Sequence, residues 1–294
     1  MIQKSVLVTG ANGQLGSEIR LLANQYPQFA FTFTDIQELD LQDSKSIMDC
    51  FSQLKPAYLI NCAAYTAVDK AENDIDLCYA INSAAVSHLA LAAKQHNTTV
   101  LHVSTDYVFD GKQSRPYRES DPVCPVSVYG KSKLQGEQAL NDICPTSSVI
   151  VRTAWLYSAF GNNFVKTMIR LGREKSELRV VSDQWGSPTY AADLAEALIK
   201  IILSAEAGHF SPGIYHYSNE GSCSWYEFAQ KIHQLAGITS CKIIPVSTAE
   251  YPTAAQRPSY SLLDKSKIRG DYGVAVPLWT ESLEACLSNF NNCK

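Results

Sequence analysis

The chain has 294 residues, of which 46% are hydrophobic and 18% charged, and its formal net charge is −4 at pH 7. This composition is typical of a globular protein that is long enough for one large domain or for two unequal lobes. The chain lacks the basic excess of nucleic-acid-binding proteins, and it has no apolar run of the ~18–20 residues that span a membrane. Neither a nucleic acid nor a membrane is therefore predicted as a partner.

Apolar runs alternate with helical patterns through the first two hundred residues. The runs that predict buried strands are Ser5–Thr9, Phe29–Thr34, Ala57–Cys62, Thr99–Ser104 and Ser148–Thr153. The helical patterns lie around residues 14–25, 44–54, 74–96 and 129–142. Such alternation predicts an α/β fold, a doubly wound parallel sheet of the Rossmann type with right-handed crossovers. A strand at Leu178–Ser182 and a helix near 191–204 are expected to continue it.

After about residue 205 glycine, proline and tyrosine become more frequent and the predicted elements become short. Ser224-Trp-Tyr-Glu227 has the capping-box pattern of a helix start, Ile243–Val246 resembles a strand, and Trp279–Asn289 resembles a last helix. We therefore predict a dinucleotide-binding domain of residues 1–154 that also receives roughly 176–205. The remaining segments, mainly 206–294, would form a smaller C-terminal substrate-binding lobe.

The nine cysteines are scattered, with no C-x-x-C pair and no neighbouring histidine cluster. The first strand-like run begins almost at the N-terminus, which leaves no room for a signal peptide. We expect free thiols in the cytoplasm, with no disulfide framework and no metal site.

A glycine-rich turn, Gly10-Ala-Asn-Gly13-Gln-Leu-Gly16, follows the first strand and opens the first helix. Glycines permit a tight turn and a close backbone approach, and the helix N-terminus then offers N–H groups to a pyrophosphate. Asp35 ends the second strand, where an acid can accept hydrogen bonds from an adenosine ribose. This favours NAD modestly, since a cation from elsewhere in the fold could accept the 2′-phosphate of NADP.

Three polar side chains are predicted to converge near the carboxyl edge of the sheet. Thr105 follows the fourth strand, and Tyr129 and Lys133 lie four residues apart on the next helix, so they share one face. A threonine hydroxyl, a phenol and an ammonium can stabilise a carbonyl oxygen that becomes negative as a hydride arrives. The Tyr-x-x-x-Lys spacing alone is weak evidence, and its weight comes from the turn upstream.

Longer motifs carry a family resemblance over nearly the whole chain, in order. They are Asn61–Glu72 (NCAAYTAVDKAE), Ser104–Gly111 (STDYVFDG), Val128–Lys133 (VYGKSK), Arg152–Tyr157 (RTAWLY), Gly161–Phe164 (GNNF), Asp183–Thr189 (DQWGSPT) and Arg257–Ser261 (RPSYS). On these motifs the chain resembles the extended short-chain dehydrogenases/reductases, and among them the family of dTDP-4-dehydrorhamnose reductases.

The resemblance implies a reaction and a set of site residues. NADPH or NADH would reduce the C4 ketone of the nucleotide sugar dTDP-4-dehydro-6-deoxy-L-mannose to dTDP-β-L-rhamnose. Thr105, Tyr129 and Lys133 would be catalytic, with Tyr129 as the acid and Lys133 lowering its pKa and holding the nicotinamide ribose. The implied cofactor contacts, together with Gly10, Gly13, Gly16, Tyr129 and Lys133, are Gln14, Leu15, Asp35, Asp40, Leu41, Ala64, Tyr65 and Thr66.

The substrate contacts implied by the resemblance are Thr105, Asp106 and Trp155, the tryptophan offering an aromatic face to the sugar. Arg257 could pair with the substrate diphosphate through its planar fork, although a surface arginine is nearly as good an interpretation. Some members of the family hold a metal between subunits, but alanine stands where a second acid is expected near Asp193. No metal is predicted, and the chain is expected to be a monomer or a homodimer.

Two other functions are open at this point. Dehydratases and epimerases share this scaffold, but a dehydratase places a glutamate after Thr-Asp, and here Tyr107 stands there. A relative of the reductase family serves as a non-catalytic, NAD(P)-binding regulatory subunit of methionine adenosyltransferase. Tyr129 and Lys133 argue against that function without excluding it. The base of the nucleotide, the preferred nicotinamide and the downstream polymer cannot be deduced from the residues alone.

Overall fold

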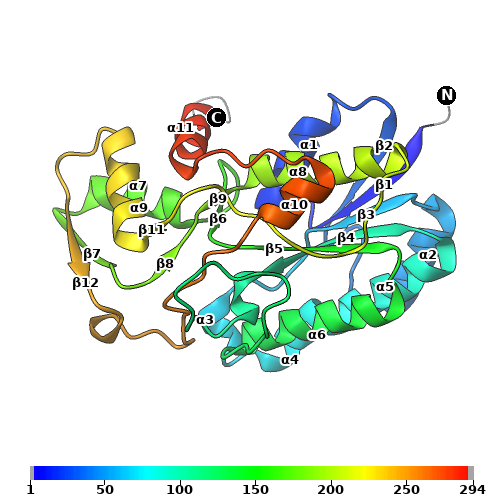
Figure 1. Cartoon of the computed structure of the whole chain (residues 1–294), viewed down its shortest axis with the longest axis horizontal. Helices are drawn as coiled ribbons and strands as arrows, with labels where there is room; N and C mark the ends of the chain where they lie inside the picture. Colours follow the sequence, from blue (N-terminus) through cyan, green and yellow to red (C-terminus); the bar gives the residue numbers. More distant parts are fainter. Residues whose placement is uncertain (1–2, 291–294) are drawn as a thin grey trace.

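Residues 3–290 are described by a computed structural model of the chain, whose main layer is a sheet of six parallel strands (Figure 1). The strands follow the order β10-β5-β4-β3-β1-β2. Their bounds are Lys4–Thr9 (β1), Phe29–Thr34 (β2), Tyr58–Asn61 (β3), Thr99–Thr105 (β4), Ser148–Thr153 (β5) and Gly213–His216 (β10). β3 and β5 are buried along their whole length, as expected for strands covered on both faces.

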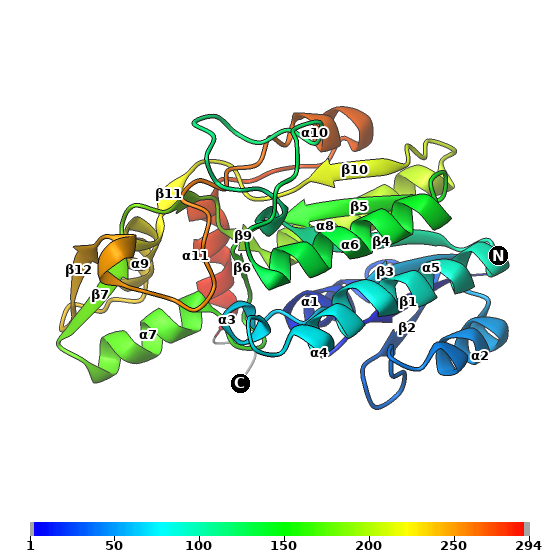
Figure 2. The ribbon, with the colours of Figure 1, turned by 90° about the horizontal axis from the view of Figure 1, so that it is seen from below.

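Helices cover both faces of this sheet (Figures 1 and 2). On one face lie α1 (Gln14–Ala23), α8 (Ala191–Glu206) and α10 (Ser266–Tyr272), which share a core with β1, β3 and β5. On the other face lie α2 (Ser44–Leu54), α5 (Ala85–His96) and α6 (Val128–Ile143), which form a second core. The sheet is therefore packed between two apolar layers. This packing fixes the position of the polar residues at the carboxyl ends of its strands.

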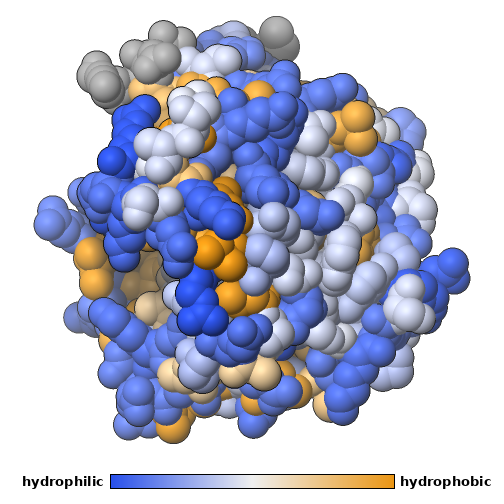
Figure 3. Space-filling view, turned by 90° about the vertical axis from the view of Figure 1, so that its left-hand side faces the viewer, coloured by the Kyte–Doolittle hydropathy of each residue, from blue (hydrophilic) through white to orange (hydrophobic). Residues whose placement is uncertain are grey.

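A smaller lobe lies beyond the carboxyl edge of the sheet, at the left of Figure 1. Its helices are α7 (Phe164–Glu174), α9 (Trp225–Leu235) and α11 (Trp279–Asn289). Its strand pairs are β6–β9 (Leu156–Tyr157, Thr189–Tyr190), β7–β12 (Glu177–Val181, Lys242–Val246) and β8–β11 (Trp185–Gly186, Cys223–Ser224). A separate apolar core around Phe228 holds these elements together. The outer end of the molecule on this side is largely hydrophilic, with scattered hydrophobic residues (Figure 3).

The α/β class and the doubly wound parallel sheet are confirmed, but one predicted strand belongs elsewhere. The segment expected at Leu178–Ser182 forms β7, which pairs with β12 in the smaller lobe and does not join the main sheet. Its buried and exposed residues alternate, as in a strand covered on one face, whereas the central strands β3 and β5 are wholly buried. The sixth strand of the main sheet is β10, so part of the segment 206–294 belongs to the main sheet and not to the smaller lobe. The boundaries of the two lobes stay a prediction.

The helix predicted over 74–96 consists of α4 (Ile75–Tyr79), a π-helical turn (Ala80–Ala84) and α5. The stretch Ile75–His96 is long and apolar enough, by length and composition alone, to cross a membrane. It packs against α2 and α6 in the core of this molecule. The remaining short elements are α3 (Val68–Ala71) and 3-10 turns at Asp106–Val108 and Thr248–Glu250. The capping box at Ser224 and the bounds of α11 are confirmed.

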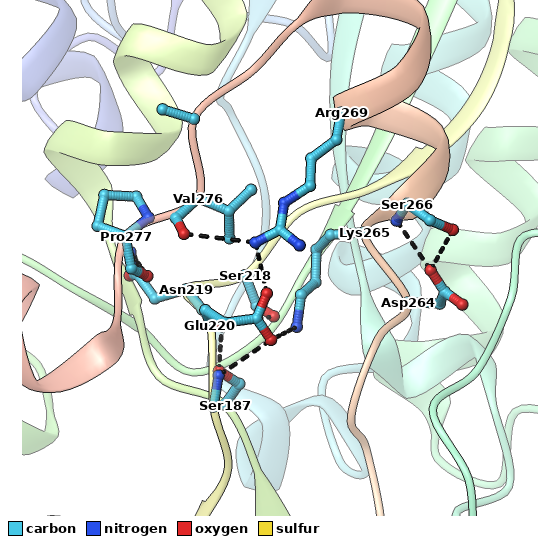
Figure 4. Close-up of polar contacts among 12 residues, drawn as sticks. Ser187, Ser218, Asn219, Glu220, Asp264, Lys265, Ser266, Arg269, Val276 and Pro277 are labelled. Atoms are coloured by element: carbon cyan, nitrogen blue, oxygen red, sulfur yellow. Dashed lines mark hydrogen bonds and ion pairs between the residues drawn. The ribbon is translucent and has the colours of Figure 1, made fainter.

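A polar cluster behind the end of β10 ties the two lobes together (Figure 4). The carboxylate of Glu220 forms ion pairs with the ammonium of Lys265 and with the guanidinium of Arg269. The distance from Lys265 Nζ to Glu220 Oε1 is 3.5 Å. The buried side chain of Asn219 donates to the carboxylate of Asp193 on α8 and to the hydroxyl of Ser282 on α11. One loop therefore connects the helix layer of the sheet with the smaller lobe.

Candidate active site

Two adjoining hollows follow the carboxyl edge of the sheet. The larger, of about 500 Å³, runs from the glycine turn across the ends of β4 and β5 to the smaller lobe. The other, of about 390 Å³, lies between the ends of β1, β2 and β3. Both are lined by Gly10, Gly13, Cys62 and Ala64, so they form one continuous groove. Ligands of open α/β sheets bind at this edge.

The glycine turn forms the floor of this groove. Gly10 has a φ of +65°, and a Cβ there would lie 2.7 Å from the Cα of Ala63, so a side chain is excluded on two counts. A Cβ on Gly16 would lie 2.5 Å from the Cα of Ala11, which shows how closely α1 approaches the turn. Gly13 caps α1 without a side-chain hydrogen bond. The first turn of α1 is thus open to an anionic group, as the sequence predicts.

Asp35, the acid after β2, has a structural role that the sequence did not predict. Asp35 accepts hydrogen bonds from the backbone N–H groups of Asn12 (2.8 Å) and Ile36 (2.9 Å), so its carboxylate holds the glycine turn. It lines the smaller hollow together with Asp40 and Leu41. These three predicted residues are brought together at what would be the adenosine end of a dinucleotide.

The segment after β3 contributes to both hollows. Ala64 and Thr66 line the groove, whereas the Tyr65 side chain donates to Asp74 (2.8 Å) on the side of α4. The backbone of Tyr65 is fixed by the side chain of Asn82, which accepts from its N–H (2.9 Å) and donates to its carbonyl oxygen (3.1 Å). Asn82 lies in the π-helical turn, and such turns are often found at functional sites.

Thr105, Tyr129 and Lys133 all line the larger hollow, as predicted. Thr105 ends β4, and its hydroxyl donates to Asp106 (3.0 Å). Tyr129 lies in the first turn of α6, where Ser127 caps the helix by accepting from the Gly130 N–H (3.1 Å). The cap fixes the start of α6 and with it the position of the phenol. The structure thus brings a hydroxyl, a phenol and an amine to one wall.

The protonation of this group is governed by burial. Burial raises the pKa of the Tyr129 phenol, and a hydrogen bond with Thr105 opposes that rise. Burial also lowers the pKa of Lys133 to about 8. The Lys133 ammonium donates to the carbonyl oxygen of Val103 (2.7 Å). The lowering of the phenol pKa that was expected from Lys133 is not found here, because burial raises this pKa and the opposing contact is the hydrogen bond with Thr105.

The predicted substrate contacts fall into two groups. Asp106 and Trp155 line the larger hollow, and Trp155 adopts a left-handed backbone (φ +49°) while its ring stacks on Trp225 at 3.6 Å. Arg257 lines a separate hollow and is paired with Asp69 (2.6 Å). Its other nitrogen donates to the hydroxyl of Tyr107 (2.8 Å), a residue of the groove. Arg257 therefore does not line the groove itself but contacts Tyr107, which does.

Several residues of the site were missed by sequence reasoning. Asn163 caps α7 and donates to the Gln14 side chain (3.0 Å), which joins the smaller lobe to the glycine turn. Asn61 and His102 form buried hydrogen bonds beneath Lys133. Their signal was available, because a polar residue within an apolar strand must find a partner in the core.

Within residues 3–290 no group of three or more His, Cys, Asp or Glu side chains is placed to hold a metal ion. Glu18 accepts a hydrogen bond from Ser158 (2.6 Å). Asp193 accepts from Asn219 and Ser282. Both carboxylates thus have protein donors.

Comparison with known proteins gives one consistent family. Residues 4–292 match the family model described as the RmlD substrate binding domain. A dTDP-4-dehydrorhamnose reductase from Aggregatibacter actinomycetemcomitans is 42% identical over 95% of this chain and 97% of its own length. The crystal structure of a Bacillus anthracis dTDP-4-dehydrorhamnose reductase in complex with NADP is 40% identical, covering 98% of this chain and all of that one, with a TM-score of 0.93. The corresponding Clostridium acetobutylicum structure is 43% identical, covering 98% of this chain and 99% of that one, with a TM-score of 0.92.

Proposed function

Because the chain belongs to the RmlD family of dTDP-4-dehydrorhamnose reductases, we infer that it is an oxidoreductase of dTDP-rhamnose synthesis. It reduces the C4 ketone of dTDP-4-dehydro-6-deoxy-L-mannose to dTDP-β-L-rhamnose, with NADPH or NADH as the reductant. The observation that carries this proposal is the convergence of Thr105, Tyr129 and Lys133 on one wall of a groove that continues into the glycine turn.

The residues of the groove fit a dinucleotide. Gly10 leaves room where a Cβ would meet Ala63, and the uncapped start of α1 at Gly13 suits a pyrophosphate. Asp35 and Asp40 line the hollow suited to the adenosine. The Bacillus anthracis relative is in complex with NADP, and other solved proteins of this fold are in complex with NAD. The carboxylate of Asp35 already holds the turn, so its presence alone does not select NADH.

A bound reduced nicotinamide supplies the hydride, and the chain supplies the proton and the electrostatic support. Tyr129 donates its phenolic proton to the C4 oxygen as that oxygen gains charge. Thr105, at the end of β4, donates its single hydroxyl proton to Asp106 in this structure, and it would turn this proton to the same oxygen when the substrate is bound. Lys133 favours the phenolate that Tyr129 leaves behind. These donors are held in place by a capped helix and a buried strand, so little reorganisation is needed during the reaction.

Substrate specificity is assigned to the wall next to the smaller lobe. Trp155 offers an aromatic face to the apolar side of the deoxysugar, and Asp106 contacts its hydroxyl groups. Arg257 reaches the diphosphate if it exchanges its contact with Asp69. Tyr107, where a dehydratase carries an acid, has no carboxylate with which to abstract a sugar proton. Simple reduction is therefore favoured over dehydration.

The main partner is a nucleotide sugar, and we propose no nucleic-acid or membrane partner and a cytoplasmic location. Residues 1–154 would hold the dinucleotide together with α8 and β10. The strands β7, β8 and β9, which fall in the range 176–205 that was predicted to join them, pair within the smaller lobe instead. The smaller lobe would hold the sugar. The chain works as a monomer or a homodimer, two states that size-exclusion chromatography with light scattering distinguishes.

The test is a direct assay. Purified protein is mixed with dTDP-4-dehydro-6-deoxy-L-mannose and either NADPH or NADH, and the loss of absorbance of the reduced cofactor is followed. The proposal expects substrate-dependent oxidation and dTDP-rhamnose as the product. Folded protein that binds the cofactor but oxidises none of it would support the regulatory function and overturn the reductase. The two cofactor titrations also decide the nicotinamide preference.

A further inference from the structure

A chain of buried polar side chains leads from β1 to the catalytic lysine. The Thr9 hydroxyl donates to Asn61 Oδ1 (2.7 Å), and Asn61 Nδ2 donates to Nδ1 of His102 (3.0 Å). The other ring nitrogen of His102, Nε2, lies 3.4 Å from Nζ of Lys133. His102 is fully buried in the middle of β4 and does not line the groove. Its contact with the residues of the groove is therefore the one with Lys133.

The orientation of the Asn61 amide fixes the tautomer of His102. The backbone N–H of Ala63 points at Asn61 Oδ1 (3.2 Å), and a backbone N–H can only donate. Asn61 must therefore turn its NH₂ group towards His102, whose Nδ1 accepts. Burial and the nearby charge of Lys133 hold the pKa of His102 well below its usual value, so the ring is neutral. A neutral ring that accepts at Nδ1 carries its proton on Nε2.

The consequence falls on Lys133. An ammonium has three N–H donors and no lone pair, so it cannot accept a hydrogen bond from the His102 N–H, and two donors face each other. A neutral amine has a lone pair that accepts from the His102 N–H, while it still donates to the Val103 carbonyl oxygen (2.7 Å). The polar chain from Thr9 is thus fully satisfied only when Lys133 has given up a proton.

The other groups around Lys133 oppose this effect. Glu137, one turn further along α6, favours the ammonium, but its carboxylate is already paired with the buried guanidinium of Arg152 (2.6 Å). Cys62 after β3 and Cys78 on α4 also favour the charged form. Burial acts in the opposite direction and is the largest influence on the pKa of Lys133, which it lowers to about 8. The His102 N–H acts in the same direction as burial.

We propose that His102 is a positioning residue for Lys133: its fixed N–H holds the lysine nitrogen and favours the amine, so that Lys133 exchanges its proton easily during turnover. The kinetic meaning of this proposal rests on the proposed function, because Lys133 supports the Tyr129 phenolate only while it is charged. The alkaline limb of kcat/KM then reports the loss of that charge.

Asn61 offers a way to reverse the tautomer without changing His102 or Lys133. In Asn61→Asp the carboxylate still accepts from Thr9 and Ala63 but now also accepts from Nδ1 of His102. The ring proton moves to Nδ1, and a lone pair on Nε2 faces Lys133. Asn61→Ser gives His102 a hydroxyl that can accept from Nδ1 and adds no charge. Both variants are expected to favour the ammonium.

The test is an NMR titration of the protein labelled with ¹³C-lysine, in which Lys133 is assigned with Lys133→Met. We expect the midpoint of Lys133 to rise by about one pH unit in Asn61→Asp. Asn61→Ser should give a smaller rise in this midpoint. It allows the same measurement if the aspartate variant does not fold. His233→Gln, which changes a buried histidine of α9, is expected to leave the midpoint unchanged.

A double-mutant cycle separates the ring from a direct charge effect. If the imidazole transmits the change, the shift caused by Asn61→Asp falls to less than half in a His102→Leu background. An equal shift in both backgrounds, or no shift in either folded Asn61 variant, overturns the proposal. The titration needs no substrate, so a negative reductase assay leaves this result standing. In an active enzyme the alkaline limb of kcat/KM should move with the midpoint.

Discussion

Tyr129 is the side chain on which the proposed chemistry depends most directly. Its phenol is buried in the groove wall beside Thr105, and its burial holds the proton on the oxygen until charge develops on the substrate. Tyr129→Phe keeps the ring and removes the proton donor, so we expect turnover to fall by on the order of 10²–10⁴ with little change in stability. Steady-state kinetics measure this, with Tyr226→Phe as the control, since Tyr226 is a half-buried tyrosine of α9 that does not line the groove. A Phe variant as fast as the parent would place the acid elsewhere.

At neutral pH the buried carboxylate of Asp106 lowers the free energy of unfolding of the protein. Burial raises its pKa to about 6, from a usual value near 3.8. Between these values the unfolded chain releases a proton that the folded chain retains, so stability falls as pH rises through this window. The loss amounts to about 3 kcal/mol above pH 6. Asp106→Asn removes this loss. In urea titrations the free energy of unfolding of this variant, relative to that of the parent, should therefore increase by this amount between pH 3.5 and 7. A difference that does not change with pH would mean that Asp106 is not penalised by burial.

At the scale of elements, Gly136 sets how closely α6 approaches the π-helical turn. A Cβ there would lie 2.2 Å from the carbonyl oxygen of Asn82, a backbone atom that cannot move freely. Gly136→Ala should therefore cost about 1–3 kcal/mol and disturb Tyr129 and Lys133 on the same helix. Gly270 in α10 has no heavy atom within 4 Å of an added Cβ. Gly270→Ala should stabilise by about 0.5–1 kcal/mol, since only the helix propensity changes. Urea denaturation measures both, and equal effects at the two glycines would contradict the contact.

Sequence reasoning predicted the elements that carry strong local signals. The strands Phe29–Thr34 and Ser148–Thr153 were predicted at their observed bounds, and the glycine turn was placed correctly between β1 and α1. The partner of β7 could not be predicted, because a short strand with one exposed face fits either sheet equally well. The Asn61–His102–Lys133 contact also escaped, since it joins three separate segments through the core. Local pattern determines elements, whereas sheet order and buried polar contacts depend on the packing of the whole chain.

At the scale of the whole molecule, Asn219 links the two lobes. Its buried side chain accepts from the Tyr190 N–H (2.7 Å) and donates to Asp193 (2.6 Å) and Ser282 (2.9 Å), which belong to β9, α8 and α11. Asn219→Ala leaves the Tyr190 N–H without its acceptor and the half-buried Asp193 carboxylate with one donor fewer, so we expect a loss of about 2–4 kcal/mol in the free energy of unfolding. Asn141→Ala, at an exposed position near the end of α6, should stay within about 0.5 kcal/mol.

Two spectroscopic probes then show whether the lobes unfold as one unit. The four tryptophans, at positions 155, 185, 225 and 279, lie in the smaller lobe or at its border, so their fluorescence reports that lobe. Far-UV circular dichroism reports chiefly the helices on the main sheet. Because Asn219 and the Glu220 cluster join both lobes, the two transitions should coincide in the parent and shift together in Asn219→Ala. A fluorescence midpoint that falls while the dichroism midpoint stays in place would show two independently stable lobes.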